Sequence, residues 1–291
     1  MKTKVLSVIL ILCLVLLPGC KSSEPVQVTA TTLPVYQFTA MLCEGTDIQV
    51  SQLITQSVSC LHDYSLNVAQ VRTLEAAEVV IISGAGLEDF MSDALCGAKN
   101  VVDSSEGVTL LESCAHHHEE NHGHHHEQDA HIWLSPANAA VMAQNIAQGL
   151  IGAYPEQEQI IQSNLLKLKQ QLQELEQYGN QQLSGLSCRD LITFHDGFGY
   201  LAQAFDLHIL EAIEEESGSE ASAQELKEMI GIVTEHELPA VFTERNGSVS
   251  AAQIIAAETG AGVYSLDMAM SEGDYFDAMY HNIDTIREAM E

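Results

Sequence analysis

Two runs of alternating strand-like and helix-like segments limit most strongly how this chain can fold. In the first run, strands are expected at 26–33, 48–54, 78–83 and 100–105, with helices at 35–43 and 67–77. The second run has expected strands at 190–195, 207–213, 240–244 and 262–267, and expected helices at 197–205, 222–236, 248–259 and 274–290. Strands that alternate with helices at this spacing form parallel βαβ units, so the sequence predicts an α/β fold with two sheets.

A single long helix is expected between the two runs. Residues 156–183 follow Tyr154 and Pro155, and they carry an apolar stripe at helical spacing formed by Ile160, Leu165, Leu168, Leu172 and Leu175. Such a helix would be about 42 Å long, which is longer than one small lobe is wide. The stripe is too short for several coiled-coil heptads, so we interpret the helix as a rigid connection between lobes. The predicted parts are an N-terminal lobe over 26–154, a linking helix over 155–186 and a C-terminal lobe over 187–291.

The beginning of the chain has the pattern of a bacterial export signal. Lys2 and Lys4 precede an apolar run over 5–17, which suits a signal peptide and is short for a bilayer span. The run ends in LLPGC at 16–20, which resembles a lipobox, where cleavage precedes a cysteine that becomes lipidated. We expect a signal peptide over 1–19 and a lipidated tether over 20–25, with Cys20 anchored at the outer face of the cytoplasmic membrane. Ordinary signal cleavage beside an incidental cysteine is the alternative.

Charge and cysteine content narrow the possible partners. The chain has 41 acidic and 11 basic residues, for a formal net charge of −30. Nucleic-acid binding depends on Lys and Arg that neutralise phosphates, so nucleic acid is excluded as a partner. An odd number of cysteines remains beyond the signal and the lipobox, so at least one does not pair within the chain; their pairing is not predicted, and they are Cys43, Cys60, Cys96, Cys114 and Cys188.

Four side chains that can bind a metal stand after predicted strands or beside a polar loop. His62 follows the second strand, His195 and Asp267 each close a strand, and His131 follows the polar residues 104–130. Ligands of open parallel sheets bind beyond the carboxyl ends of the strands, so these side chains are expected to meet across a cleft between the lobes. Three imidazoles and one carboxylate suit a tetrahedral Zn²⁺ site. Taken singly, each residue also has a structural explanation, and Asp267 in particular could cap a turn.

In their order along the chain, several motifs resemble those of the zinc- and manganese-binding lipoproteins that supply ATP-driven (ABC) metal importers. The motifs are HDYSL at 62–66, DAHIWLSP at 129–136, FHDGFGYLA at 194–202, AVFTERNGS at 240–248 and the C-terminal segment that starts with LDMAM at 266. The resemblance covers nearly the whole chain. It implies two α/β lobes joined by a rigid helix with the metal in the cleft between them, and a monomeric binding protein, not an enzyme, whose partner is a membrane permease.

The same resemblance implies a set of metal ligands. It assigns His62, His131 and His195, and it places Asp267 as the fourth ligand, with water or a Cys60 thiolate as alternatives. Imidazole suits Zn²⁺, whereas oxygen-rich shells suit Mn²⁺. Manganese members carry glutamate where this chain has His195, which favours zinc as the cargo. We discount His208, His236 and His281 as structural or surface residues.

A histidine-rich segment at 115–128 shortly precedes His131. Its imidazoles belong to His116, His117, His118, His122, His124, His125 and His126. Tracts of this composition bind metals, and zinc members of the resembled family often carry such a loop before the second histidine ligand. We interpret the segment as an auxiliary metal collector of lower affinity. A solvated loop with incidental metal affinity is the alternative.

The function predicted from the sequence is therefore the capture of Zn²⁺ outside the cytoplasm for an ABC importer. The nearest alternative is a manganese-binding member of the same family. Less favoured are a surface adhesin with a structural metal and a zinc hydrolase, which would need a general base beside the metal. Asp63 and Asp196 stand next to predicted ligands, but neither belongs to a recognisable hydrolase motif.

Overall fold

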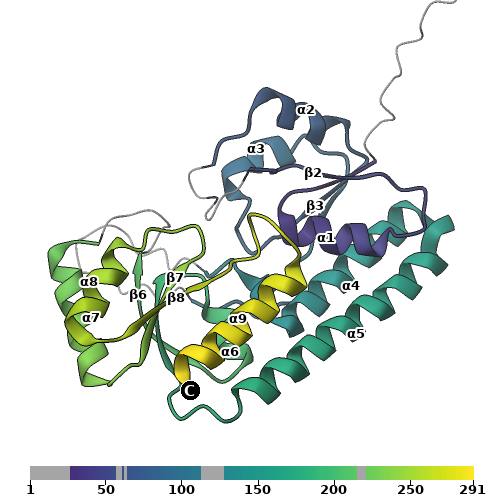
Figure 1. The fold of residues 1–291 in the computed structure, drawn as a ribbon. Coiled ribbons are helices and arrows are strands. Elements are labelled where there is room, and N and C mark those ends of the chain that lie inside the picture. Colours follow the sequence, from purple (N-terminus) through teal and green to yellow (C-terminus); the bar gives the residue numbers. More distant parts are fainter. Residues whose placement is uncertain (1–26, 57–60, 62–63, 113–127, 215–220) are drawn as a thin grey trace, which may run out of the picture.

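The N-terminal lobe of the computed structural model is built on a four-stranded parallel sheet (Figure 1). The structure describes residues 27–56, 61, 64–112, 128–214 and 221–291. The sheet order is β2-β1-β3-β4, with the strands at Val28–Ala30, Val50–Gln52, Val79–Ile82 and Val101–Asp103 for β1 to β4. Val28 pairs with Val50 on one side and Val79 on the other, so β1 and β3 form the centre of the sheet.

Two helices of this lobe begin at side-chain caps. The helices are α1 (Leu33–Leu42), α2 (Val68–Ala76), α3 (Ser92–Leu95) and α4 (Pro136–Ala153), with 3₁₀ turns η1 (Asp89–Met91) and η2 (Ile132–Leu134). Asn67 and Gln70 form a reciprocal capping box at the start of α2, and Ser135 caps α4 with Pro136 in its first turn. α4 therefore starts directly after the segment that carries His131.

The C-terminal lobe repeats the same sheet plan. Its strands are β5 (Asp190–His195), β6 (His208–Glu214), β7 (Ala240–Glu244) and β8 (Gly262–Leu266), all parallel, in the order β6-β5-β7-β8. The helices are α6 (Gly199–Ala204), α7 (Ala223–Glu235), α8 (Ser250–Thr259) and α9 (Tyr275–Met290). In both sheets the strand order changes direction between the two central strands: β2 lies on one side of β1 and β3 on the other, and β6 and β7 flank β5 in the same way. Such a switch point is where open α/β sheets bind ligands, beyond the carboxyl ends of the strands.

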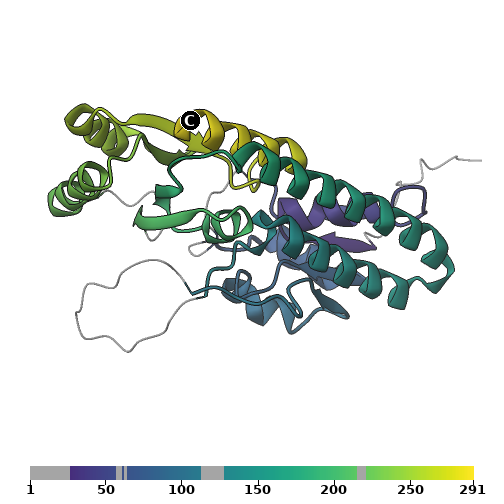
Figure 2. The same ribbon diagram turned by 90° about the horizontal axis from the view of Figure 1, so that it is seen from below.

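Helix α5 (Glu158–Leu183) follows a 3₁₀ turn, η3 (Pro155–Gln157), and joins the two lobes. At 26 residues it is about 39 Å long. It packs against α1 and α4 of the N-terminal lobe and against α9 of the C-terminal lobe, and Figure 2 shows α4 and α5 side by side along the molecule. The buried stripe begins at Ile161, which is fully buried, and continues through Leu165 and Leu168. The inclusion of Ile160 in this stripe was wrong: it is 38% exposed, because the regular spacing of three and four residues leads back from Leu165 to Ile161.

One hydrophobic core extends through the N-terminal lobe, α5, α6 and α9, while a second, smaller core fills the space between the sheet of the C-terminal lobe and helices α7 and α8. The lobes therefore share apolar packing. Phe38 of α1 meets the ring of Tyr275 edge to face at 4.8 Å, and the Tyr275 hydroxyl donates to the carbonyl of Trp133 at 2.7 Å. These contacts hold the lobes against each other near the carboxyl edges of the sheets.

The predicted fold class is confirmed: two parallel α/β lobes are joined by one long helix. The strands of the N-terminal lobe are shorter than predicted, whereas β5 and β7 have the predicted bounds. β1 covers three residues of the predicted 26–33, because the run continues into α1. The turn of helix at Asp89–Leu95 was not predicted. The division at 26–154, 155–186 and 187–291 stays a prediction, while the signal over 1–19 and the tether with Cys20 lie outside the described residues.

Two further sequence-based questions concern cysteines and membrane spans. Cys43, Cys96 and Cys188 are free thiols, and burial raises the pKa of the Cys43 thiol to about 12. Cys60 and Cys114 lie outside the described part of the chain. No helix within the described residues is both long and apolar enough to cross a bilayer.

Candidate metal centre

Two of the predicted ligands, one from each lobe, meet with their outer ring nitrogens facing each other. His131 stands just before η2, and His195 is the last residue of β5. Their Nε2 atoms lie 3.4 Å apart, and the rings meet edge to face. Two nitrogens bound to one tetrahedral Zn²⁺ would lie about 3.3 Å apart, given Zn–N bonds of about 2.05 Å. The observed separation therefore fits two ligands on one zinc ion.

An adjacent carboxylate orients His131. Asp129 Oδ1 lies 2.8 Å from Nδ1 of His131 and also accepts the backbone N–H of the same residue at 2.8 Å. An ionised carboxylate only accepts hydrogen bonds, so Nδ1 carries the proton and the Nε2 lone pair points toward His195. Histidine ligands of metals usually donate their other N–H to a carboxylate in this way. Asp129 was not among the predicted site residues, although its position two residues before His131 is a local signal for such a contact.

A close approach of backbone to both rings depends on Gly197, which follows the β5 strand by two residues. A Cβ atom at this position would lie 2.8 Å from His195 Cδ2, 2.9 Å from His131 Cε1 and 2.7 Å from Met268 Cε. All three distances are shorter than real side-chain contacts, so only glycine lets the chain pass the two imidazoles without displacing them. Gly197 is a second residue of the site that sequence reasoning missed.

Asp267 follows β8 directly, and both of its carboxylate oxygens are engaged. Oδ2 accepts a hydrogen bond from Arg245 Nη1 at 2.7 Å, and Oδ1 accepts the backbone N–H of Ala269 at 2.8 Å. The second contact is a turn-capping interaction, the structural alternative for Asp267. Within the described ranges, no three or more His, Cys, Asp or Glu side chains are grouped closely enough to hold a metal, so Asp267 does not form such a group with the two imidazoles.

The loop that carries Asp267 is tied to the N-terminal lobe through Trp133. The Trp133 indole N–H donates to the carbonyl of Met268 at 2.8 Å, and its ring lies edge to face against His131. Burial raises the pKa of the Tyr275 phenol, so this hydroxyl stays protonated and donates to Trp133 from the other lobe. The surroundings of His131 thus connect directly to the loop after β8.

The remaining predicted ligands lie outside the described residues. These are His62, the alternative ligand Cys60 and the imidazoles at 116, 117, 118, 122, 124, 125 and 126. The base of the histidine-rich segment is described: Glu112 and Gln128 form an antiparallel bridge, and the Asp129 N–H donates to the Leu111 carbonyl at 2.9 Å. After this segment the described chain therefore resumes at Gln128, three residues before His131.

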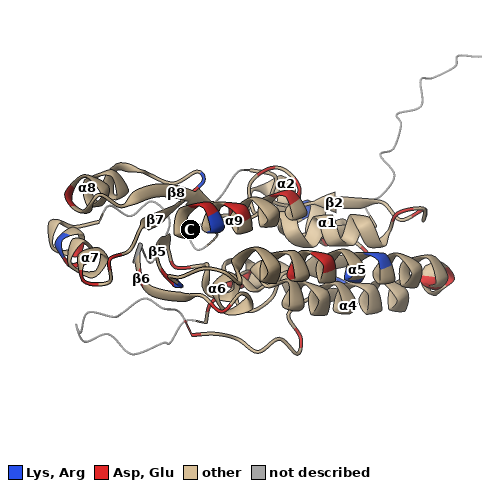
Figure 3. Cartoon of the chain, turned by 60° about the horizontal axis from the view of Figure 1, so that its bottom comes forward, with Lys and Arg blue, Asp and Glu red and all other residues tan. Residues whose placement is uncertain are grey.

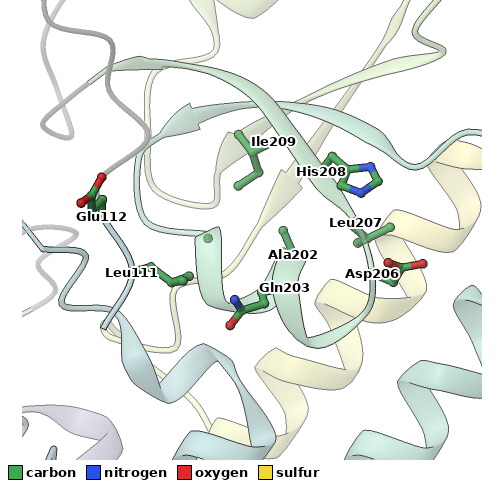
Figure 4. A pocket seen from close by; sticks show the side chains of 9 residues that line it. Leu111, Glu112, Ala202, Gln203, Asp206, Leu207, His208 and Ile209 are labelled. Atoms are coloured by element: carbon green, nitrogen blue, oxygen red, sulfur yellow. The ribbon is translucent and has the colours of Figure 1, made fainter. Parts of the chain in front are cut away.

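A separate hollow of about 340 Å³ lies beside the base of this segment (Figure 4). Leu111 and Glu112 line one side, and residues of α6 and the start of β6 line the other, including Ala202 and His208. None of the predicted ligands is among its lining residues. His208 is largely exposed and lies 3.3 Å from Asp190 Oδ1, which agrees with its interpretation as a surface residue.

The electrostatic setting of the imidazole pair favours a cation. Acidic residues are spread over the helices of both lobes, whereas basic residues are sparse (Figure 3). The two rings are themselves buried, with exposed fractions of 5% for His131 and 2% for His195. Burial lowers the effective dielectric constant, and so a bound cation would interact more strongly with its ligands here than at the surface.

Comparison with known proteins places this arrangement in a family. Residues 28–289 match the family described as "ZnuA: Zinc-uptake complex component A periplasmic". The chain is 25% identical to the "High-affinity zinc uptake system protein ZnuA" of Bacillus subtilis (strain 168), with 96% of this chain and 95% of that protein covered. It is 28% identical to the "Zinc-binding protein AdcA" of Streptococcus pyogenes serotype M3; 90% of this chain is covered, and the match spans about half of that protein (55%).

The fold comparison agrees with the sequence comparison. A solved structure titled "Crystal structure of ZnuA" superposes with a TM-score of 0.79 at 30% sequence identity, covering 91% of this chain and 99% of that one. The similarity to these proteins thus extends over almost the whole described chain, including both sheets, the long helix and the segments that carry the paired histidines. The chain belongs to the family of the periplasmic component A of zinc-uptake complexes.

Proposed function

We propose that this protein captures Zn²⁺ outside the cytoplasm and delivers it to the membrane permease of an ABC importer. The observation that carries the proposal is the buried pair of Nε2 atoms, 3.4 Å apart, contributed by His131 and His195 from different lobes. Zinc is the cargo, and the protein is the binding component of a transport system. The matched family and the Bacillus subtilis relative are named as zinc-uptake components. The manganese alternative is less well supported, because two imidazoles already face the site.

His62 is the proposed third imidazole ligand, and Asp267 is the proposed fourth ligand. His62 is assigned by the resemblance of its motif, while the place of Asp267 after β8 puts it at the same edge of the sheet as His195. The histidine-rich segment is proposed as an auxiliary collector, supported by its base lying three residues from His131. Cys20 is the proposed lipid anchor, and the protein acts as a monomer at the outer face of the cytoplasmic membrane.

The test is a zinc titration of the full chain and of two histidine variants. Structural zinc sites of four ligands bind with about 10–16 kcal/mol, so each ligand supplies roughly 2.5–4 kcal/mol on average. His195→Ala is therefore expected to weaken the tightest zinc site by about 10²–10³-fold, measured by competition with a chelator. His208→Ala is the matched control, since it removes an exposed imidazole from the neighbouring strand β6, and it should change affinity by less than about twofold.

Wild-type affinity in His195→Ala would contradict the assignment of the site. Metal analysis of the protein as purified and after chelation identifies the cargo, and manganese in place of zinc would favour the alternative. Sustained hydrolysis of an ester or peptide by the zinc-loaded protein would favour the zinc hydrolase alternative.

A further inference from the structure

The charge partner of Asp267 stands at the end of the neighbouring strand. Arg245 follows β7, Asp267 follows β8, and the backbone N–H of Arg245 donates to the carbonyl of Leu266 at 2.8 Å. The Arg245 guanidinium then reaches the Asp267 carboxylate at 2.7 Å. The Asp267 side chain is only 3% exposed, whereas that of Arg245 is 58% exposed. A buried carboxylate is thus paired with a cation that retains access to solvent.

Asp267 does not need Arg245 to hold its position. Its backbone N–H donates to Asn282 Oδ1, and its carbonyl accepts from Asn282 Nδ2, both at 2.7 Å. Its Oδ1 is fixed separately by the N–H of Ala269. Three contacts therefore set the backbone and one oxygen, and Arg245 engages only the other oxygen, Oδ2.

We infer that Arg245 competes with zinc for the Asp267 carboxylate and so sets the affinity and the release rate of the metal. The inference rests on the proposed function. In the structure Asp267 pairs with the guanidinium, and it is not grouped with the imidazole pair as part of a metal site. When zinc arrives, Oδ2 exchanges the guanidinium for the metal. When zinc leaves, Arg245 takes the carboxylate back, and the buried charge is never left without a cation.

The surroundings of Arg245 allow this exchange. Arg245 lines a shallow hollow of about 260 Å³ together with Asn246, Ser271, Glu272 and Gly273. A guanidinium that leaves Asp267 can move into this solvent-accessible space, where the Glu272 carboxylate offers an alternative partner. The guanidinium gains hydration when it leaves and loses only a partly screened ion pair, because its side chain is already more than half exposed.

The sign of the effect separates this role from a purely orienting one. A partner that orients a metal ligand raises metal affinity, so its removal weakens binding. A competing cation lowers affinity both by occupying the ligand and by repelling the metal, so its removal tightens binding. The competing role predicts tighter binding without Arg245, and the orienting role predicts weaker binding.

The experiment measures zinc affinity by chelator competition and zinc release by rapid mixing with excess chelator, on the full chain. Arg245→Gln should bind zinc about fivefold more tightly and release it correspondingly more slowly, the size expected for a half-exposed ion pair. Arg245→Lys keeps the charge but loses the forked geometry, and it should fall between Arg245→Gln and the wild type. Arg72→Gln, an exposed arginine on α2, removes the same charge elsewhere and should leave both quantities within about twofold.

The dependence on Asp267 completes the test. In an Asp267→Asn background, Arg245→Gln should no longer change zinc affinity, because the competed ligand is absent. Unchanged or weaker binding in Arg245→Gln would overturn the role of Arg245, as would the same tightening in the Asp267→Asn background. Absence of tight zinc binding by the wild type, or wild-type affinity in His195→Ala, would instead overturn the proposed function and the role of Arg245 with it. Arg245→Lys keeps the inference testable if Arg245→Gln does not fold.

Discussion

The carboxyl edges of the two sheets share one topology but carry different chemistry. In the N-terminal lobe, the switch point between β1 and β3 is filled by the buried Glu88 carboxylate. It accepts hydrogen bonds from the Thr31 hydroxyl at 2.6 Å and from the backbone N–H groups of Ser83 and Gly84 at 2.8 and 2.9 Å. In the C-terminal lobe, the corresponding point between β5 and β7 carries His195, whose Nε2 faces the other lobe.

The difference shows that topology offers a site and the side chains decide whether it is used. All the donors around Glu88 come from its own lobe, so this edge is closed by a local hydrogen-bond network. At the C-terminal edge, His195 instead faces His131 of the other lobe, and Asp267 pairs with the half-exposed Arg245 of its own lobe. We therefore expect perturbations at the first edge to change folding stability, and perturbations at the second edge to change metal affinity.

The largest expected effect concerns Glu88 and is one of stability. Burial raises the pKa of this carboxyl from 4.5 to about 7, and the nearby Asp103 charge acts in the same direction, while the three hydrogen bonds oppose it. Between these pH values the unfolded chain releases the proton and the folded chain retains it, so stability falls as pH rises. Relative to Glu88→Gln, the wild type should lose up to about 3 kcal/mol of unfolding free energy between pH 4.5 and pH 8.

Denaturant unfolding at several pH values checks this effect. Glu75→Gln on the exposed face of α2 removes the same charge from the same lobe, and it should run parallel to the wild type across the range. The zinc affinity of Glu88→Gln should stay near that of the wild type. A pH profile of Glu88→Gln that is parallel to the wild type, or a large loss of zinc affinity, would break the proposed division between the two edges.

The next effect concerns Gly197 at the other edge. Gly197→Ala places a methyl group within 3 Å of both imidazoles and of Met268, so the rings must shift. Overpacking of this kind costs about 1–3 kcal/mol, and because the displaced groups are the proposed ligands we expect zinc binding to weaken by about 10- to 100-fold. Gly231→Ala in α7 meets no atom within 4 Å, and it should leave zinc affinity unchanged while adding a little helix stability. Equal zinc affinities in the two variants would show that the rings are not sterically confined.

The fold could be predicted from the sequence more fully than the site. Apolar periodicity identified the strands, the long helix and the two-lobed plan, because each of these depends on local pattern. It misplaced Ile160 because adjacent apolar residues leave the phase of a helical stripe ambiguous until the packing is known. Asp129 was missed although its contact with His131 is local, two residues along the chain. Gly197 and Arg245 were missed for a different reason: the fold brings His131 close to Gly197 and the Asp267 carboxylate within 2.7 Å of Arg245. The assignment of His62, His131, His195 and Asp267 as ligands stays a prediction.

A smaller loss of zinc affinity is expected from a change at Asp129, the partner of the N-terminal lobe's proposed ligand His131. Asp129→Asn keeps the shape of the side chain but removes the charge that holds the Nδ1 proton of His131. Loss of such a carboxylate partner should weaken zinc binding by about tenfold. Asp47→Asn, at an exposed position of the same lobe, should have no measurable effect in the same titration. If Asp129→Asn binds zinc as the wild type does, the carboxylate has only a structural role in the segment before η2.

The smallest effect on the tightest site is expected from deletion of residues 116–126. This change removes all seven imidazoles of the histidine-rich segment but leaves its base, where Glu112 pairs with Gln128. Metal binding by imidazoles of one loop costs conformational entropy for each residue that the metal orders. His131 and His195, in contrast, are already held in place by the packing around them. Calorimetry should therefore show the tightest zinc site within about twofold of the wild type and fewer weak sites. A Gly/Ser segment of equal length serves as the control for loop closure. Loss of the tightest site in both variants, with His62 and His195 intact, would make the histidine-rich segment the principal site. The difference between the two sheet edges would then not explain where zinc binds.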